Sequence, residues 1–120
     1  MQVPYRARTV IRFGAFELDL RAGELRKPGL KTRLQQQQFR ALALLLEHPG
    51  EVVTREELRQ AIWPAVDFDE SLDATIYKLR NTLGDSSENE GFVETLPRRG
   101  YRFIAPAEEL HVHLKKNSRA

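Results

Sequence analysis

The sequence predicts an α+β fold, in which an N-terminal antiparallel sheet precedes three helices and a C-terminal β-hairpin. Short alternating segments broken by glycine fill residues 10–34. Apolar side chains recur at helical spacing in residues 35–48, 54–62 and 70–84. Two alternating segments then flank a turn within residues 92–104. Residues 10–105 are therefore expected to form the domain, with residues 1–9 as a lead-in and 106–120 as a linker or tail.

Composition bounds the kind of protein before any motif is considered. A chain of 120 residues is long enough for one domain with a modest core. The absence of cysteine excludes disulfides and thiolate metal sites, and it fits a cytoplasmic location. The longest apolar run, residues 41–46, is too short to span a bilayer, so we expect no membrane contact within this chain.

The net charge of +2 hides an uneven distribution. Residues 1–35 carry eight basic and three acidic side chains, and residues 36–70 carry three and seven. Residues 71–120 carry eight basic and seven acidic side chains. Acidic side chains therefore collect in the middle of the chain and basic ones at its start and near its end.

The N-terminal segment reads as three or four short antiparallel strands joined by tight turns. Its alternating runs break at Gly14, at Gly23 and at Pro28-Gly29. The sheet is expected to be structural. Its many arginines form either a solvated face or a secondary surface that contacts phosphates.

The first two helices begin after this sheet. In residues 35–48, Phe39, Leu42, Ala43 and Leu46 lie at i, i+3, i+4 and i+7, which predicts a core-facing helix ended by Pro49-Gly50. In residues 54–62, Thr54 and Glu57 form a capping box at the helix start. Val53 and Leu58 stand at the positions of a hydrophobic staple, and Leu58, Ala61 and Ile62 are expected to face inward.

The third helix, residues 70–84, carries the most informative pattern. Its apolar face consists of Leu72, Ile76, Leu79 and Leu83, with Gly84 at the position of a left-handed C-terminal cap. The opposite face is small, polar and partly cationic, and it consists of Glu70, Ala74, Tyr77, Lys78 and Asn81, with Ser71 at its edge. Such a face suits insertion into the major groove of DNA, where Lys78 is the best candidate for reading guanine.

The last element is a hairpin whose tip is cationic. Residues 92–96 and 101–104 alternate, and Pro97, Arg98, Arg99 and Gly100 form the turn between them. Two consecutive helices followed by such a hairpin define a winged helix-turn-helix, with residues 70–84 as the recognition helix. Arg98 and Arg99 are expected to enter a narrow, A·T-rich minor groove, where the potential is most negative.

Residues 34–103 resemble the OmpR/PhoB-type winged-helix DNA-binding domain. The resemblance rests on EHPGEVVTREEL, on the tryptophan after the second helix, on IYKLRNTLGD and on FVETLPRRGYRF. The last of these is most similar to the CadC/ToxR-type branch, in which the DNA-binding domain is N-terminal. Because the first strand starts close to Met1, we expect no receiver domain before it.

The resemblance implies residue roles in sequence-specific binding of double-stranded DNA by a bacterial-type transcriptional regulator. Groove-facing positions are matched by Ser71, Ala74, Thr75 and Lys78, and backbone-contacting positions by Tyr77 and Arg80. The helical pattern agrees on Ala74, Tyr77 and Lys78, but it puts Thr75 and Arg80 on the flanks of the helix, where phosphates lie. Thr95 matches a phosphate contact of the wing strand. Two copies on tandem half-sites are implied, with RNA polymerase as a possible contact of the loop before the recognition helix.

Two residues depart from the pattern of the family. Glu70 and Pro97 stand where some members carry arginine, so the minor-groove role shifts to Arg98 or Arg99. Glu70 and the neighbouring Asp69 and Asp73 place three acids at the groove end of the recognition helix, which disfavours nonspecific DNA binding.

An alternative function is a protein-interaction module that docks through residues 63–68. There Trp63, Asp67 and Phe68 form either a docking surface or an aromatic plug at the edge of the core. An enzyme is not favoured, because no histidine pairs with a nucleophile and no glycine-rich phosphate loop follows a strand. No cofactor is expected, and no metal, because His111 and His113 have no further ligands nearby in the sequence.

Overall fold

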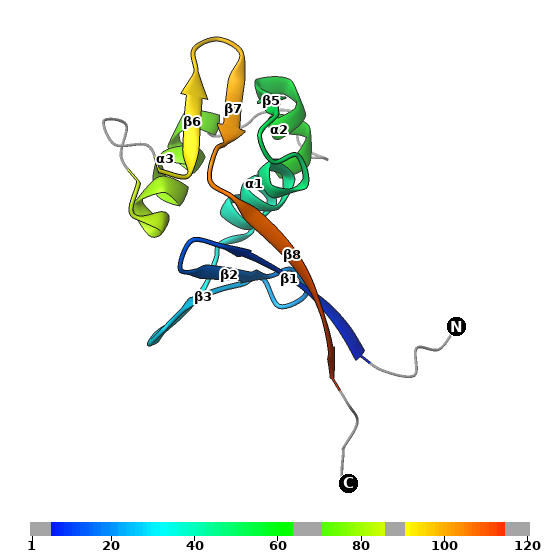
Figure 1. Ribbon diagram of the computed structural model, residues 1–120. Coiled ribbons are helices and arrows are strands. Elements are labelled where there is room, and N and C mark those ends of the chain that lie inside the picture. Colours follow the sequence, from blue (N-terminus) through cyan, green and yellow to red (C-terminus); the bar gives the residue numbers. More distant parts are fainter. Residues whose placement is uncertain (1–5, 64–70, 86–90, 115–120) are drawn as a thin grey trace, which may run out of the picture. The chain divides into compact units, whose positions relative to one another are not determined.

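The computed structural model describes residues 6–63, 71–85 and 91–114, which form two compact units. One, here the sheet unit, combines Met1–Arg33 with Ala107–Ala120, and the other, here the helical unit, is Leu34–Pro106. Figure 1 labels their elements in chain order. The predicted order of sheet, three helices and hairpin is confirmed.

The sheet unit is a five-stranded antiparallel sheet. Its strands lie in the order β4-β3-β2-β1-β8, with bounds β1 Arg6–Phe13, β2 Phe16–Asp19, β3 Glu24–Lys27, β4 Leu30–Arg33 and β8 Ala107–Leu114. The prediction of three or four short N-terminal strands is therefore confirmed, with four strands present. Asp19 is fully buried, and its carboxylate accepts hydrogen bonds from the backbone of Arg21 and Ala22 and from the side chain of Arg26. These bonds order the turn between β2 and β3.

Strand β8 corrects the sequence-based expectation for both ends of the chain. Residues 107–114, expected to be linker, pair with β1 along its whole length, from Phe13 opposite Ala107 to Arg6 opposite Leu114. Part of the expected lead-in, Arg6 to Thr9, belongs to β1. The signal was present in the alternation of Leu110, Val112 and Leu114 with histidines and acids. Pairing with β8 satisfies backbone groups along one edge of β1.

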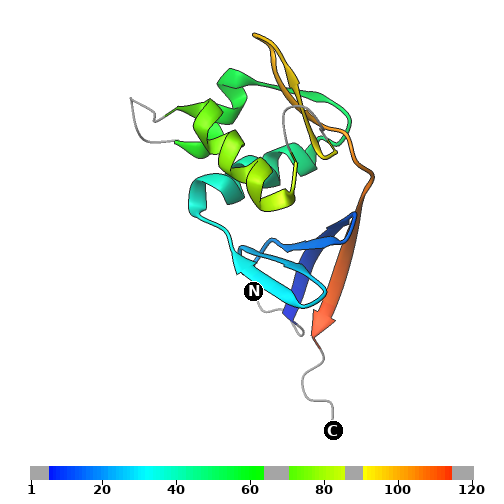
Figure 2. The ribbon, with the colours of Figure 1, turned by 90° about the vertical axis from the view of Figure 1, so that its left-hand side faces the viewer.

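The helical unit contains the three helices and a smaller sheet. The helices are α1 Gln36–Glu47, α2 Arg55–Ile62 and α3 Leu72–Leu83, and the strands are β5 Val52–Thr54, β6 Val93–Leu96 and β7 Gly100–Phe103. The strand order is β5-β7-β6, so the predicted hairpin is extended by a third strand. Figure 2 shows the hairpin together with the three helices. We call β6, β7 and the turn between them the wing.

Local signals placed the helices well, but the buried face of α1 differs from the prediction. Gln38, Ala41, Leu42, Leu45 and Leu46 are buried, whereas Phe39 and Ala43 are only half-buried. The sequence of α1 is apolar over most of its surface, so several helical stripes fit it and periodicity alone does not choose between them. None of the helices in the described parts of the chain has the length and apolar character to cross a membrane.

The second helix follows the prediction at its start. Thr54 caps α2 and exchanges both hydrogen bonds of a capping box with Glu57, at 3.1 and 2.9 Å. Val53 and Leu58, at the staple positions, are buried. Leu58 and Ile62 face the core as expected, and Ala61 is half-buried. The helix is thereby fixed at its first turn.

Candidate nucleic-acid interface

The recognition helix α3 presents a continuous exposed strip. Ser71 caps the helix by accepting a hydrogen bond from the backbone N–H of Ala74 at 3.1 Å, and Gly84 ends it in the left-handed conformation, with φ of 84°. The predicted apolar face is buried. The exposed strip consists of Ser71, Ala74, Tyr77, Lys78 and Asn81, all five predicted to lie there. Tyr77 is 65% exposed, which is high for a large ring.

Thr75 and Arg80 lie at the flanks of α3, where the helical pattern of the sequence puts them. Thr75 is only 6% exposed, and its hydroxyl faces the backbone carbonyl of Ser71 at 3.4 Å. Arg80 is half-buried and donates to the carbonyl oxygen of Val93 at 3.0 Å and to the hydroxyl of Thr95. Both were expected to contact the DNA; in the structure Thr75 lies on the buried side and Arg80 binds β6.

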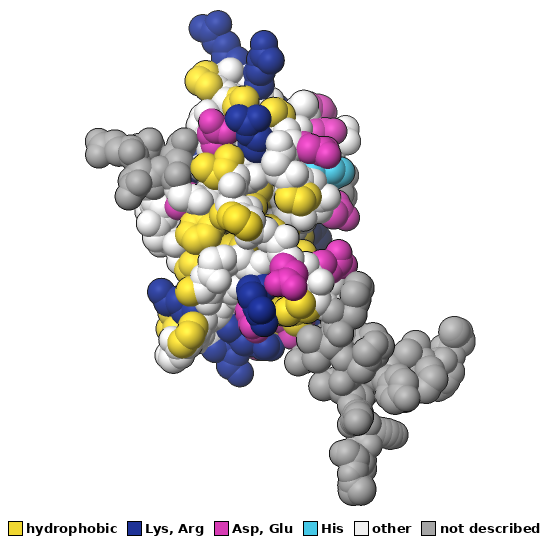
Figure 3. All heavy atoms as spheres, in the orientation of Figure 1, with side chains coloured by type: hydrophobic (Ala, Val, Ile, Leu, Met, Phe, Trp, Pro, Cys, Tyr) yellow, Lys and Arg dark blue, Asp and Glu magenta, His cyan; other side chains and the backbone are white. Residues whose placement is uncertain are grey.

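The turn of the wing presents two cations. The N–H of Arg99 donates to the carbonyl of Leu96 at 2.9 Å, which closes a four-residue turn with Pro97 and Arg98 at its centre. Arg98 has φ of 67°, a left-handed conformation that glycine or asparagine usually supplies. Arg98 and Arg99 are both exposed, and Figure 3 shows Lys and Arg side chains projecting from this end of the hairpin.

Backbone contacts fix the base of the wing. The carboxylate of Asp85, which is 7% exposed, accepts hydrogen bonds from the N–H groups of Gly91, Phe92 and Val93, at 2.9 to 3.1 Å. This role of Asp85 was not predicted from the sequence. The only hint was an aspartate directly after a capping glycine, a pattern too common to carry a prediction.

Gly100 lets the wing pack against β5. A Cβ atom at this position would lie 2.0 Å from the carbonyl oxygen of Val53 and 2.9 Å from the Cα of Thr54. Both are backbone atoms in a paired strand, so they cannot move aside cheaply. Gly100 therefore allows a backbone approach that any side chain would block.

The carboxylate of Asp73, in the first turn of α3, is paired with side chains from α2 and from the wing. Arg55 of α2 donates to both carboxylate oxygens of Asp73, at 2.9 and 3.4 Å, and the hydroxyl of Tyr101 on β7 donates to the same carboxylate. The Arg55 hydrogen bond is the main cause that lowers the pKa of Asp73 below its ordinary value. Burial, and then the bond to Asp73, raise the pKa of Tyr101 to about 12. Asp73 is therefore a carboxylate paired with Arg55 and Tyr101, and not an isolated negative charge at the start of α3.

A hollow lies on the other flank of α3. It measures about 410 Å³ and is lined by the glutamines at the start of α1, Gln35–Gln38, together with Thr75 and Lys78. Gln35, the N-cap residue of α1, makes no side-chain capping bond, and the first turn of the helix carries no acid. The start of α1 therefore places the positive end of its helix dipole beside Lys78, with no acidic side chain in its first turn.

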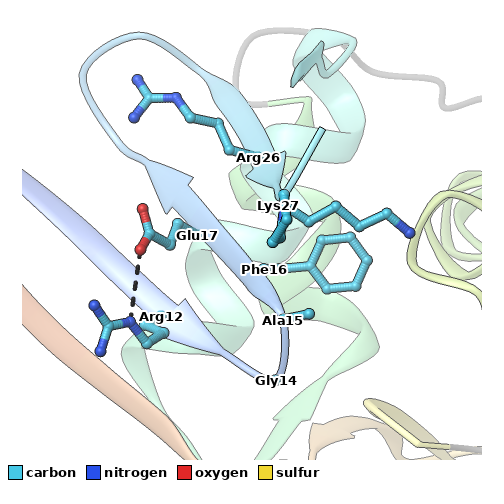
Figure 4. A pocket seen from close by; sticks show the side chains of 8 residues that line it. Arg12, Gly14, Ala15, Phe16, Glu17, Arg26 and Lys27 are labelled. Carbon is cyan, nitrogen blue, oxygen red and sulfur yellow. Dashed lines mark ion pairs between the residues drawn. The ribbon is translucent and has the colours of Figure 1, made fainter. Parts of the chain in front are cut away.

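Two cations of the sheet unit pair with acids of the same sheet. Arg26 pairs with Asp19 at 2.9 Å, and Arg12 pairs with Glu17 at 3.6 Å. Figure 4 shows Lys27 beside the ring of Phe16, with Arg12 and Arg26 pointing away from that ring. Arg12 and Arg26 are therefore paired within the sheet, in line with its expected structural role, whereas Arg21, Lys31 and Arg33 are exposed.

The residues predicted for protein docking are described only in part. Trp63 is half-buried at the C-cap of α2, and its backbone N–H donates to the backbone carbonyl of Arg59 at 2.8 Å. Asp67 and Phe68 lie outside the described residues, as do Asp69 and Glu70.

Comparison with known proteins identifies a family and its relatives. Residues 29–103 match the family model described as "Transcriptional regulatory protein, C terminal". The cholera toxin homolog transcriptional activator of Vibrio parahaemolyticus is 42% identical over 81 residues, covering 65% of this chain and 28% of that protein. The cholera toxin transcriptional activator of Vibrio cholerae is 36% identical over 91 residues, covering 73% and 31%. This chain thus spans about a third or less of these curated relatives.

Known structures give the same result for the fold. The DNA-binding domain of Escherichia coli CadC aligns with a TM-score of 0.73 and 25% identity, covering 86% of this chain and 98% of that one. The DNA-binding domain of Klebsiella pneumoniae RstA, in complex with the RstA box, aligns with a TM-score of 0.69 and 26% identity, covering 79% and 96%. The predicted winged-helix architecture is thereby confirmed.

Proposed function

Since the chain belongs to the OmpR/PhoB-type family of C-terminal domains of transcriptional regulatory proteins, we propose that it binds double-stranded DNA sequence-specifically to regulate transcription. The observation that carries this proposal is the exposed strip of α3 beside a wing whose turn presents two arginines. The major groove of DNA is wide enough for an α-helix, and the negative potential of a narrow minor groove attracts arginine side chains. Such a domain acts on promoter DNA in the cytoplasm.

We assign base reading to the centre of the strip. Lys78 donates to the acceptor edge of guanine, and Asn81 is suited to adenine. Ala74 and the ring of Tyr77 present apolar surface to thymine methyl groups, and Ser71 contacts a neighbouring base or phosphate. These five residues are exposed and adjacent on one side of the helix, which supports their joint assignment.

Phosphate contacts set the register of the protein on DNA. Gln35–Gln38 at the start of α1 and the nearby Lys78 line one hollow, which suits a phosphate on one flank of the major groove. Thr95 lies on the other flank, exposed on β6. Arg80 supports Thr95 through their hydrogen bond, so we assign Arg80 to holding this contact and not to making it alone.

A second copy completes the interaction on tandem half-sites. One domain neutralises only a few phosphates, so a single copy binds weakly and with a modest salt dependence. Two copies on one operator gain affinity through effective concentration. RNA polymerase is the further partner that we propose, through the segment between α2 and α3.

In vitro selection of bound DNA from a random pool tests the proposal. The expected result is an enriched motif repeated in tandem, which is lost when Lys78→Glu or the pair Arg98→Glu and Arg99→Glu is introduced. Lys31→Glu is the matched control, because it makes the same charge change at an exposed residue of the sheet unit. It should leave the selected motif unchanged. Lack of enrichment by the wild-type chain at low salt would refute sequence-specific binding.

A further inference from the structure

Tyr101 connects the wing to the recognition helix and is 4% exposed. It lies on β7 directly opposite Thr95 of β6, and its hydroxyl donates to the carboxylate of Asp73. A buried hydroxyl needs such a partner, because leaving it unpaired costs about 1–3 kcal/mol. The side chain of Tyr101 thus bridges from the strand to the first turn of α3.

Arg80 holds the same tyrosine from a second point on α3. Its guanidinium lies 5.8 Å from the centre of the Tyr101 ring, and it also donates to Val93 and Thr95 of β6. Asp73 and Arg80 are seven residues apart on one flank of the helix, which corresponds to about two turns. Two points of attachment along the helix axis resist both sliding and rotation of the wing against α3.

Arg55 extends this connection to the turn of the wing. Its side chain pairs with Asp73, and its backbone N–H donates to the carbonyl of Arg99 at 3.3 Å. The turn that carries Arg98 and Arg99 is therefore tied through α2 to the start of α3. Arg55 and Tyr101 both donate hydrogen bonds to the carboxylate of Asp73. The connection through α2 and the connection through β7 therefore meet at this residue.

We propose that Tyr101 is a positioning residue that sets the distance between the recognition helix and the wing arginines, and thereby sets specificity for the sequence flanking the core site. This inference rests on the proposed DNA binding. Neither Tyr101 nor Asp73 is needed to read the major groove in this scheme. Their removal loosens the wing, so the minor-groove contact loses its sequence dependence while the recognition helix still reads its bases.

The test compares three duplexes: the selected operator, one with base pairs of the core changed, and one with A·T pairs of the flank changed to G·C. Dissociation constants of the full chain are measured by fluorescence anisotropy for the wild type, Tyr101→Phe, Asp73→Asn and Thr82→Val. Thr82→Val is the matched control, because it removes a hydroxyl of α3 whose bonds go to the backbone carbonyl of Lys78 and to Gln38, and not to the wing. Thermal melts report whether each variant folds.

The expected result separates the two grooves. The wild type and Thr82→Val should discriminate against each altered duplex by about tenfold, the typical cost of a mismatched site. Tyr101→Phe should keep the core discrimination but lose most of the flank discrimination, down to about threefold or less. Asp73→Asn should do the same to a smaller degree, and it replaces Tyr101→Phe as the test if that variant does not fold. Adding Tyr101→Phe to Arg98→Ala should cause no further loss on the flank.

Two results would overturn the inference and leave the proposed function standing. One is that Tyr101→Phe binds all three duplexes more weakly by the same factor, with both discrimination ratios unchanged. That result would indicate a tyrosine with a purely structural role. The other is a wild type that discriminates the core but not the flank. If the proposed function itself is wrong, the result differs. The wild type would then bind both altered duplexes as well as it binds the selected operator.

Discussion

Asp73 and Arg55 form a bidentate ion pair that joins the first turn of α3 to the first turn of α2. The two guanidinium nitrogens of Arg55 lie 2.9 and 3.4 Å from the carboxylate oxygens of Asp73. The pair changes how the acids at this end of the recognition helix are understood. From the sequence, Asp73 is one of three acids that oppose DNA binding. In the structure its carboxylate pairs with Arg55 and also accepts from Tyr101, so it joins α2 and the wing to the start of α3.

Replacing Asp73 with asparagine should lower the free energy of unfolding by about 1 kcal/mol near neutral pH, since the pair is largely exposed. The pKa of Asp73 is lowered in the folded chain, so its contribution is present above the unfolded value and is lost as pH falls through the folded value. Urea unfolding of both proteins from pH 7 to pH 3 measures this. The difference should stay constant down to about pH 4 and shrink below it. A difference that grows in acid would contradict the ion pair.

Tyr101 should ionise late in an alkaline titration. Its pKa of about 12 lies above the ordinary value of 10.0, so its contribution to stability is complete below pH 10 and declines as pH rises toward 12. Tyrosinate absorbance of the chain should contain a component near pH 12 that Tyr101→Phe removes. A titration curve with no such late component would show that the hydroxyl does not have the buried, Asp73-bonded surroundings of the structure.

Arg98→Gly should separate stability from DNA binding. Glycine adopts the observed φ of 67° without strain, so the free energy of unfolding should stay the same or rise by about 1 kcal/mol. Affinity for the selected operator should fall by roughly tenfold, the value of one charge-assisted contact. Arg98→Lys, which keeps charge and strain, serves as the control and should lose less affinity. If Arg98→Gly binds as well as the wild type, the strained arginine has no role in the minor groove.

Gly100→Ala should destabilise the helical unit more than an ordinary glycine substitution does. The new methyl group would overlap the carbonyl oxygen of Val53, and we expect a loss of at least about 2 kcal/mol. Gly29→Ala is the matched control, since Gly29 has φ of 80° and no heavy atom within 4 Å of the added Cβ. It should cost only about 1 kcal/mol of backbone strain. Equal losses in thermal unfolding would exclude the close approach of β5 and β7.

Strong local signals account for the parts of the fold that the sequence predicts. The capping box of α2 and the leucine face of α3 are set by neighbouring residues, and both are confirmed. The partner of a strand is not local. The segment 107–114 alternates visibly, but nothing near it in the chain indicates that β1 pairs with it across almost the whole sequence.

The same distinction applies to the candidate interface. Helical geometry predicts that Ala74, Tyr77 and Lys78 lie opposite the leucines, and they are exposed. It also places Asp73 and Arg80 on one flank and Thr75 on the other, but it does not say what packs against each flank. The wing covers the first flank through Tyr101, and Thr75 is buried on the second. Those neighbours decide which predicted contacts remain available to DNA.

Amide chemical-shift mapping of the labelled chain with its selected operator tests the central claim most directly. The account predicts large changes for the amides of residues 74–81 and of residues 98–100 in the turn of the wing, with small changes in β1 to β4. A control duplex with the core bases changed should reduce the changes in α3. Changes concentrated in the sheet unit, with the amides of Ala74, Tyr77 and Lys78 unmoved at saturation, would contradict it.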